Sequence, residues 1–343
     1  MEHCGIDLHS ASSEVAVLDE DGELVEQSRI ATIEAGFRRH FGKRERMVIC
    51  MESGGQSAWA ERLLQSFGHD TVVASASRGR LIAEATLKND KVDAVILARL
   101  VRADRRLLCP ITHRSAETQR QRGVLRVRRA FVDTRTKCLN ATRGILRSFG
   151  YRTPGKKPER LAEYLADAAI PEELVRVVAP LVQVALEVDE KIAALDEEIE
   201  AMGHAYPEVA LLRTVPGVGP LIALAFVLCI ENPHRFSRGR DLSGYHGLRP
   251  KMRESATTSR FGSITRQGDI EMRMLLVQAA HGLLRSRADS DLKRWAQGLA
   301  ERIGKKKAVV ALARKLAVVM HAMWVRNEPF RPFLEVVEVD TAA

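Results

Sequence analysis

Residues 4–9, Cys-Gly-Ile-Asp-Leu-His, place one acidic side chain, Asp7, inside an apolar run. The alternation of residues 3–8 and 13–18 predicts two strands, and Asp-Glu-Asp-Gly at 19–22 is a turn signal before a third strand near 23–30. An aspartate is disfavoured inside a strand, and burying its charge is costly without a partner. Asp7 is therefore the first candidate functional residue.

The next segments alternate between helical and extended patterns. Helices are predicted at 33–42 and 56–67, and short apolar strands at 47–51 and 71–74. Two further helices are predicted at 78–86 and 91–106. Three consecutive strands followed by alternating helices and strands favour an α/β domain with a mixed sheet.

Three more carboxylates stand at the ends of these predicted elements. Glu52 follows the strand at 47–51, and Asp90 and Asp93 lie three residues apart at the start of a helix, so they share one face. Carboxylates from separated segments can converge if they share cations, and Mg²⁺ (or Mn²⁺) suits a set of oxygen ligands. Two such ions can flank a scissile phosphate.

Each carboxylate also has an ordinary explanation. Asp90 and Asp93 could be a charge pair favoured by the helix dipole, and Glu52 could be a helix-entry residue. The combined order is more specific: an aspartate on the first strand, a glutamate after a later strand and an aspartate pair on a later helix. This order is typical of the ribonuclease-H-like (RuvC-like) fold.

The composition agrees with an anionic partner without requiring one. The chain has 343 residues, 45% of them apolar, and a net charge of +9 with a pI near 9.5. This excludes a disordered chain of low hydrophobicity and leaves two readings open, a nucleic-acid-binding protein and a basic but ordinary soluble protein. The start of the chain does not resemble a signal peptide, and no apolar run of about 18 residues predicts a membrane span. The five widely spaced cysteines suggest reduced thiols in a cytosolic protein.

The middle of the chain is expected to form two long helices. Between 113 and 152 there are eleven Lys and Arg but only two acids, with apolar residues at roughly helical spacing. After a break at 153–158, a second helix is predicted at 171–203. Such a pair could pack as a coiled-coil-like hairpin. A solvated helix pair explains the apolar stripe, but it does not explain the positive charge of the first helix. Arg126 and Arg129 on that helix are therefore candidate nucleic-acid contacts.

The last region is expected to be mostly helical, with closing helices at 268–287, 290–303 and 305–326. Pro216, Gly217 and Gly219 lie between two apolar segments, as in a helix-hairpin-helix that binds phosphate without reading sequence, or in a plain turn between helices. Residues 248–267 show no clear periodicity and are expected to be a loop. The predicted domains are 1–110, 111–204 and 205–330, with a tail at 331–343.

The expected loop region is strongly basic. From 238 to 266 there are seven Lys and Arg against two acids. Cations around a phosphodiester would stabilise the charge that develops when a serine attacks phosphorus. On chemistry alone Ser255, Ser259 and Ser263 are equal candidates. The candidate phosphate contacts here are Arg249, Lys251, Arg253, Arg260 and Arg266.

The chain resembles the DEDD transposases of the IS110 insertion-sequence family over roughly residues 3–290. The matching motifs are Gly-Ile-Asp-Leu-His at 5–9, Met-Glu-Ser-Gly-Gly at 51–55 and Lys-Asn-Asp-Lys-Val-Asp-Ala at 88–94. The resemblance implies that Asp7, Glu52, Asp90 and Asp93 are the metal ligands. It also implies that Ser255, five residues after the proline of Gly-Leu-Arg-Pro, is the nucleophile. Gly54 and Ala256 differ from the residues usual in the family.

The resemblance implies a recombinase that cleaves DNA through a phosphoserine link and rejoins it. A non-coding bridge RNA would guide it, and a dimer or tetramer would combine its half-sites. The alternative is a hydrolytic nuclease or junction resolvase, in which water attacks and Ser255 only binds phosphate. A third reading is a nucleic-acid-binding protein without activity, against which the complete set of acids and the serine argue.

Overall fold

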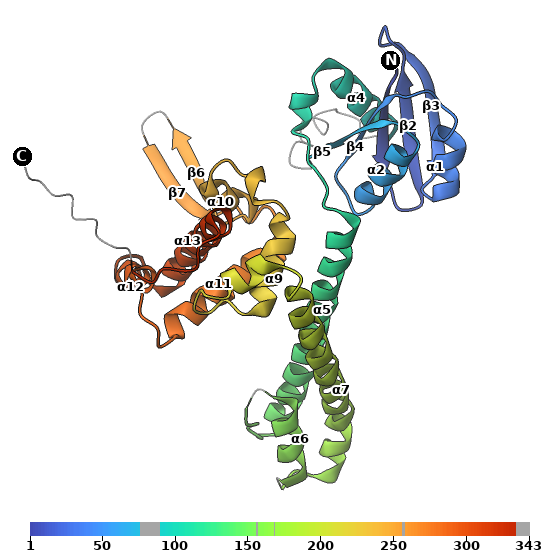
Figure 1. Ribbon diagram of the computed structural model, residues 1–343. Helices are drawn as coiled ribbons and strands as arrows, with labels where there is room; N and C mark the ends of the chain where they lie inside the picture. The colour runs from blue at the N-terminus through green and yellow to red at the C-terminus, as the bar shows by residue number, and fades with distance from the viewer. Residues whose placement is uncertain (76–89, 156, 168, 256–257, 334–343) are drawn as a thin grey trace, which may run out of the picture. The chain divides into compact units, whose positions relative to one another are not determined.

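The computed structural model describes residues 1–75, 90–155, 157–167, 169–255 and 258–333 (Figure 1). The chain divides into two compact units, Met1–Ser115 and Ala116–Ala343, and each is described by itself. The helix predicted at 78–86 lies outside the described residues. The further division of the second unit into a helical segment and a C-terminal domain stays a prediction.

The first unit is built on a five-stranded mixed sheet, as predicted. Its strands lie in the order β3-β2-β1-β4-β5. Strand β1 pairs antiparallel with β2 and parallel with β4; β2 also pairs antiparallel with β3, and β4 parallel with β5. The strands are β1 (His3–Leu8), β2 (Ser12–Leu18), β3 (Leu24–Ala31), β4 (Val48–Glu52) and β5 (Asp70–Ala74).

Helices cover both faces of the sheet. Alternate residues such as Ile6 and Met51 face α1 (Glu34–Phe41) and α2 (Ser57–Ser66), where Phe37 is fully buried. The residues between them, including Cys50, face the other side and pack with Leu97 of α4 (Asp90–Ala103). A short 3-10 turn, η2 (Arg105–Leu108), follows α4. Because side chains alternate along a strand, Asp7 and Glu52 belong to the α4 face.

Helix α4 contacts β1 backbone to backbone at Gly5. A Cβ atom added to Gly5 would lie 1.9 Å from the carbonyl oxygen of Ala94 and 2.6 Å from the amide nitrogen of Ala98. No side chain fits into that space. The glycine therefore allows α4 to lie directly on β1, which brings the first turn of α4 close to Asp7.

We expect Gly5→Ala to destabilise the first unit by at least about 2 kcal/mol, because one methyl group overfills this contact and must push α4 away. The unfolding midpoint in urea measures the effect. Gly54→Ala is the matched control, since a Cβ at Gly54 meets nothing within 4 Å. Equal midpoints for the two variants would contradict the close contact.

The second unit begins with an antiparallel helix pair, α5 (Ala116–Ser148) and α7 (Glu172–Gly203). Arg128 pairs with Asp196, and Arg135, further along α5, pairs with Asp189, which comes earlier in α7. Helix α6 (Pro158–Asp167) joins them in an apolar cluster with Leu146 and Val178. The two predicted long helices are confirmed, whereas coiled-coil packing stays a prediction.

Helix α9 (Pro220–Ile230) is buried at every position from Ile222 to Ile230, and its residues share one apolar core with residues of the helices that follow it. The closing helices are close to their predicted ranges. The elements are α8 (Pro207–Leu212), η3 (Pro233–Arg235), η4 (Gly239–Asp241), α10 (Leu242–Tyr245), α11 (Ile270–Arg285), α12 (Asp291–Ile303) and α13 (Lys305–Arg326).

The expectation of a loop at 248–267 was wrong. The segment contains two antiparallel strands, β6 (Pro250–Ser255) and β7 (Thr258–Ile264), which form a sheet of their own. The strands are polar and their register shifts between Pro250 and Met252. The sequence therefore lacks the apolar alternation by which a half-buried strand is recognised.

Among the described residues, α13 is the one helix long and apolar enough to cross a membrane by length and composition. Half of that stretch is buried inside the second unit, where Leu312, Leu316 and Met320 join its core. The packing agrees with a core helix, a kind of helix that passes the same test.

A buried ion pair connects α5 to the start of α11. Asp269 caps α11 by accepting the Met272 amide at 2.9 Å, and its other oxygen accepts Arg122 at 2.6 Å and the Cys229 thiol at 3.4 Å. Burial by itself would raise the pKa of Asp269, but the Arg122 charge and these hydrogen bonds lower it to about 2. Asp269 therefore stays ionised throughout the ordinary pH range.

We expect Asp269→Asn to destabilise the second unit by about 3 kcal/mol, because it leaves the Arg122 charge buried without its partner. The pKa of Asp269 is lower in the folded than in the unfolded protein. The pair therefore contributes stability above about pH 4, which is lost as the pH falls toward 2. Urea unfolding measures the free energy of unfolding at pH 7 and at pH 3. The difference between these two values should be smaller in Asp269→Asn than in the native protein. Asp196→Asn, which breaks a more exposed pair, should cost less than about 1 kcal/mol; similar losses in both variants would contradict this role.

Candidate functional site

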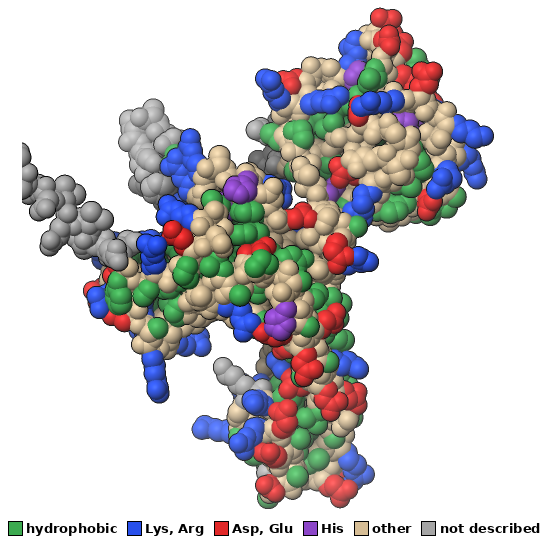
Figure 2. Space-filling model, viewed as in Figure 1, with side chains coloured by type: hydrophobic (Ala, Val, Ile, Leu, Met, Phe, Trp, Pro, Cys, Tyr) green, Lys and Arg blue, Asp and Glu red, His purple; other side chains and the backbone are tan. Residues whose placement is uncertain are grey.

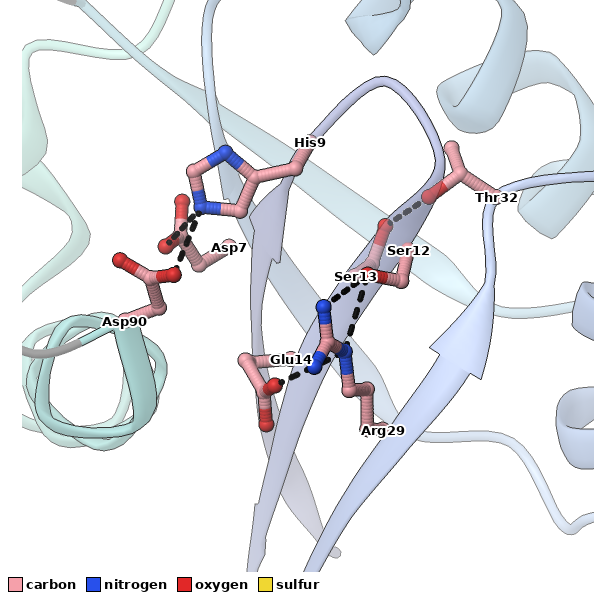
Figure 3. Close-up of polar contacts among 8 residues, drawn as sticks. All are labelled: Asp7, His9, Ser12, Ser13, Glu14, Arg29, Thr32 and Asp90. Atoms are coloured by element: carbon pink, nitrogen blue, oxygen red, sulfur yellow. Dashed lines mark hydrogen bonds and ion pairs between the residues drawn. The ribbon is translucent and has the colours of Figure 1, made fainter.

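Three side chains meet at the end of β1 beside the start of α4 (Figure 3). Nε2 of His9 lies 3.0 Å from Oδ2 of Asp7 and 3.4 Å from Oδ2 of Asp90. One ligand atom from each residue lies within 4.8 Å of the other two. Two of the four carboxylates identified in the sequence are thus brought together, although 83 positions separate them in the chain.

Asp93 contributes to the same electrostatic environment from the first turn of α4. Burial raises the pKa of Asp7, and the Asp90 and Asp93 carboxylates raise it further, while the contact with His9 opposes them. The cluster of negative charge is therefore costly in the absence of a cation. A bound positive ion would offset that cost.

Glu52 lies at the end of the neighbouring parallel strand. Ile6 is in register with Met51, so Asp7 and Glu52 occupy the next position on adjacent strands and share the α4 face. The turn after Glu52 is fixed by Ser57, whose hydroxyl accepts the Gly54 amide at 3.0 Å and lies 2.9 Å from Nε2 of His113. Glu52 is thus held at the same end of the sheet as Asp7.

This donor set fits a divalent cation. Carboxylate oxygens dominate it, they come from rigid strands and a helix start, and the most buried of them gains from a nearby positive charge. The carboxylates suit Mg²⁺ and Mn²⁺ alike, whereas the single nitrogen donor, His9, suits Mn²⁺ better than Mg²⁺.

Ser255 lies in the second unit, at the last position of β6. It is in register with Thr258, and these two residues form the last pair of the two strands. Ser259 pairs with Glu254, and Ser263 lies near the far end of β7. The backbone alone places Ser255 nearest the tip of the hairpin.

The turn between α8 and α9 carries the three predicted phosphate-binding residues. Gly217 has a φ of +87°, and an added Cβ would lie 2.5 Å from the Leu283 amide nitrogen, so the turn packs directly on α11. Gly219 is the N-cap of α9, and a Cβ there would meet nothing within 4 Å. Pro216 stands at the start of the same turn. A turn between two helices fits both a helix-hairpin-helix and a plain turn, so the helix-hairpin-helix and its binding of phosphate stay predictions.

The predicted basic contacts differ in their surroundings. Arg249, Lys251 and Arg266 are exposed beside the β6–β7 hairpin, where Figure 2 shows Lys and Arg side chains. Arg253 and Arg260 occupy opposite positions on β6 and β7. On α5, Arg126 is exposed.

Arg129 on α5 is already engaged within the helix. Its guanidinium binds both oxygens of Asp133, at 3.0 and 2.9 Å. A phosphate would therefore have to compete with a carboxylate for Arg129, whereas Arg126 forms no ion pair within the part of the chain that the structure describes.

Two family models match the chain. A transposase model of the IS110 DEDD type matches residues 4–150, and a model described as "Transposase IS116/IS110/IS902 family" matches residues 209–296. The first includes all four carboxylates and the second includes Ser255 and the α8–α9 turn.

Curated relatives agree with these matches. The transposase for insertion sequence element IS1111A of Coxiella burnetii is 29% identical over 95% of this chain and 90% of its own length. A putative transposase of Sinorhizobium fredii, y4pF/y4sB, is 31% identical over 85% of this chain and 76% of its own. The chain belongs to the IS110/IS116/IS902 family of transposases. A shorter match, 27% identical over 41% of this chain and 45% of the relative, is to a pilin gene-inverting protein of Moraxella bovis.

Membership establishes the class of the protein, an insertion-sequence transposase and hence an enzyme that acts on DNA. The mixed α/β sheet followed by a helical region is consistent with the ribonuclease-H-like arrangement expected of a DEDD transposase.

Sequence reasoning missed two residues in and beside the cluster formed by Asp7, His9 and Asp90. His9 follows Asp7 by two positions, so the strand period would place both on one face, but period alone does not show that they meet. Glu14 stands directly opposite Asp7 in the register of β1 and β2. Its side chain is 9% exposed; Oε1 lies 3.5 Å from Nε of Arg29, and Oε2 is buried with no hydrogen-bond partner among the described residues (Figure 3).

We expect Glu14→Met to stabilise the metal-free transposase by about 1 kcal/mol, because replacing a buried, incompletely paired charge by an apolar side chain removes its desolvation cost. Arg29→Met should have the opposite sign, since it removes the one ion-pair partner of the buried Glu14 carboxylate. Urea unfolding in EDTA measures both. Destabilisation by Glu14→Met would contradict the assignment of Glu14 as an unsatisfied charge.

Proposed function

We propose that this transposase breaks and rejoins DNA strands through Ser255, with divalent ions, Mg²⁺ or Mn²⁺, held by Asp7, Glu52, Asp90 and Asp93. The observation that carries the metal-binding part is the approach of Asp7 and Asp90 at the end of β1, with Asp93 and Glu52 on the same face. The family match carries the part that concerns DNA transposition.

Each residue has a separate task in this proposal. Asp7 and Glu52 are fixed by the sheet, and Asp90 and Asp93 by α4, so the metal site keeps its shape before DNA arrives. When bound, divalent cations polarise a scissile phosphate and neutralise its charge. Near the serine, a phosphate would be held by the basic residues of and around the β6–β7 hairpin, Arg249, Lys251, Arg253, Arg260 and Arg266.

The serine reaction keeps the number of phosphoester bonds constant. Oγ of Ser255 forms a bond to phosphorus, the bond from phosphorus to one deoxyribose oxygen breaks, and the proton of the serine hydroxyl ends on that oxygen. A hydroxyl at another DNA end then attacks the phosphoserine, restores Ser255 and joins the new strands. No nucleotide cofactor is needed, because one phosphoester replaces another at each step.

Contacts that do not depend on sequence would position the DNA. The α8–α9 turn offers backbone amides at the start of α9, and Arg126 offers an exposed charge on α5, with Arg129 available if it leaves Asp133. Pro216, Gly217 and Gly219 shape that turn.

Two further parts of the proposal rest on the family resemblance: guidance by a non-coding bridge RNA, and a dimer or tetramer that combines its half-sites. The location proposed is the bacterial cytosol, where both nucleic acids are found.

Rejoining is favoured over simple hydrolysis by one comparison. A relative named for inverting a pilin gene must by that name reconnect DNA ends, and part of this chain is similar to it. A hydrolytic junction resolvase would leave free ends instead.

We expect Ser255→Ala to abolish a covalent protein–DNA adduct, because only the hydroxyl of Ser255 attacks phosphorus. The measurement uses labelled substrate DNA carrying the element ends, with Mg²⁺, and denaturing gels that retain covalent complexes. Ser259→Ala and Ser263→Ala are the matched controls and should keep the adduct.

Other outcomes separate the alternatives. Cleaved ends without any adduct in the native protein would support hydrolysis and overturn the serine mechanism. An adduct that persists in Ser255→Ala but disappears in Ser259→Ala or Ser263→Ala would move the nucleophile. The same reaction with and without a transcript of the DNA flanking the gene tests RNA guidance.

A further inference from the structure

His9 is placed on the proposed metal site by the strand that carries Asp7. Its Nε2 atom faces both carboxylates, at 3.0 Å from Asp7 and 3.4 Å from Asp90, while the other ring nitrogen points away from them (Figure 3). No part of the four-carboxylate assignment uses this side chain.

These distances match the spacing of ligands around one ion. Mg²⁺ and similar small cations bind at about 2.1 Å with near-octahedral geometry, so neighbouring ligand atoms lie about 3 Å apart. The separation of Nε2 from the Asp7 oxygen is 3.0 Å. Asp90 is 56% exposed at the start of α4, so its side chain can adjust over the few tenths of an ångström that remain.

A nitrogen ligand changes which ion is preferred. Mg²⁺ takes oxygen ligands almost exclusively, whereas the affinity of imidazole rises along the first-row divalent metals from Mn²⁺ onward. Replacing one oxygen ligand by an imidazole nitrogen therefore increases the preference of a site for Mn²⁺ over Mg²⁺.

We propose that His9 is a direct ligand of an ion held by Asp7 and Asp90, and that its imidazole shifts the preference of this site from Mg²⁺ toward Mn²⁺. The inference rests on the proposed metal-binding function and adds a ligand to it. In the bound state Nε2 donates its lone pair to the ion, and the proton of the neutral ring is on Nδ1.

A competing explanation is that His9 only positions Asp7. In that case Nε2–H donates a hydrogen bond to the Asp7 carboxylate and never touches the ion. Asn at position 9 separates the two roles, because its amide can donate a similar hydrogen bond but lacks a nitrogen lone pair for a metal. His9→Asp gives an all-oxygen site with a residue that can still bind.

The direct test is pulsed electron paramagnetic resonance of Mn²⁺ bound to the full-length protein without DNA. A coordinated imidazole gives a nitrogen modulation, and ¹⁵N-histidine labelling assigns it to histidine. We expect the modulation in the native protein and in His204→Ala, a control that removes the exposed histidine directly after α7. We expect its loss in His9→Asn.

Calorimetric titration with Mn²⁺ and with Mg²⁺ provides the second readout. The ratio of Mn²⁺ to Mg²⁺ affinity should fall roughly tenfold in His9→Asn and His9→Asp, and remain unchanged in His204→Ala. The ratio is used because His9→Asp also adds a negative charge, which strengthens binding of every cation.

The failures of the two proposals can be told apart. A native protein that binds Mn²⁺ without a histidine modulation, and whose affinity ratio survives His9→Asn, would overturn the role of His9 and leave the metal site intact, provided that Asp7→Asn still removes binding. If Asp7→Asn changes neither Mn²⁺ nor Mg²⁺ binding, the metal site proposed above is itself wrong.

Discussion

The direct contact of α4 with β1 is the constraint on which the arrangement of the first unit depends. Gly5 leaves no room for a side chain between the strand and the backbone of Ala94 and Ala98. Helix α4 therefore lies closer to the backbone of β1 than it could if a side chain stood between them. Its first turn lies beside the end of β1. The contact of Gly5 with Ala94 lies one turn after Asp90 on α4. This contact brings Asp90 and Asp93 close enough to Asp7 for their charges to raise its pKa.

Sequence patterns predicted the strands of the first unit and the order of its acids, because alternation and element order are local properties. They could not give distances, which depend on the strand register and on how deeply α4 packs. His9 and Glu14 illustrate the difference: each lies on the expected face, but which side chain each one meets is decided by neighbouring elements. The hairpin at 250–264 was missed because the sequence of its strands is polar and shows no regular apolar alternation.

The charge bias of α5 carries a similar lesson. Eleven basic residues between 113 and 152 predicted nucleic-acid contacts, and the bias had no other visible explanation in the sequence. In the fold, Arg128 and Arg135 pair with acids of α7 that lie more than 50 residues away, and Arg122 pairs with Asp269. Figure 2 shows acidic side chains along this helix pair. Part of the positive charge of α5 therefore forms ion pairs within the protein and is not available to bind phosphate.

The isolation of the β6–β7 hairpin has a consequence for fidelity. Among the described elements these two strands contact mainly each other, and a hairpin of two strands is only marginally stable by itself. If Ser255 is the nucleophile, as proposed above, these strands would present it in a defined position when a bound duplex braces them. Cleavage would then depend on recognition. A DNA that binds without stabilising the hairpin would dissociate uncleaved, because the serine would not be positioned at its phosphate.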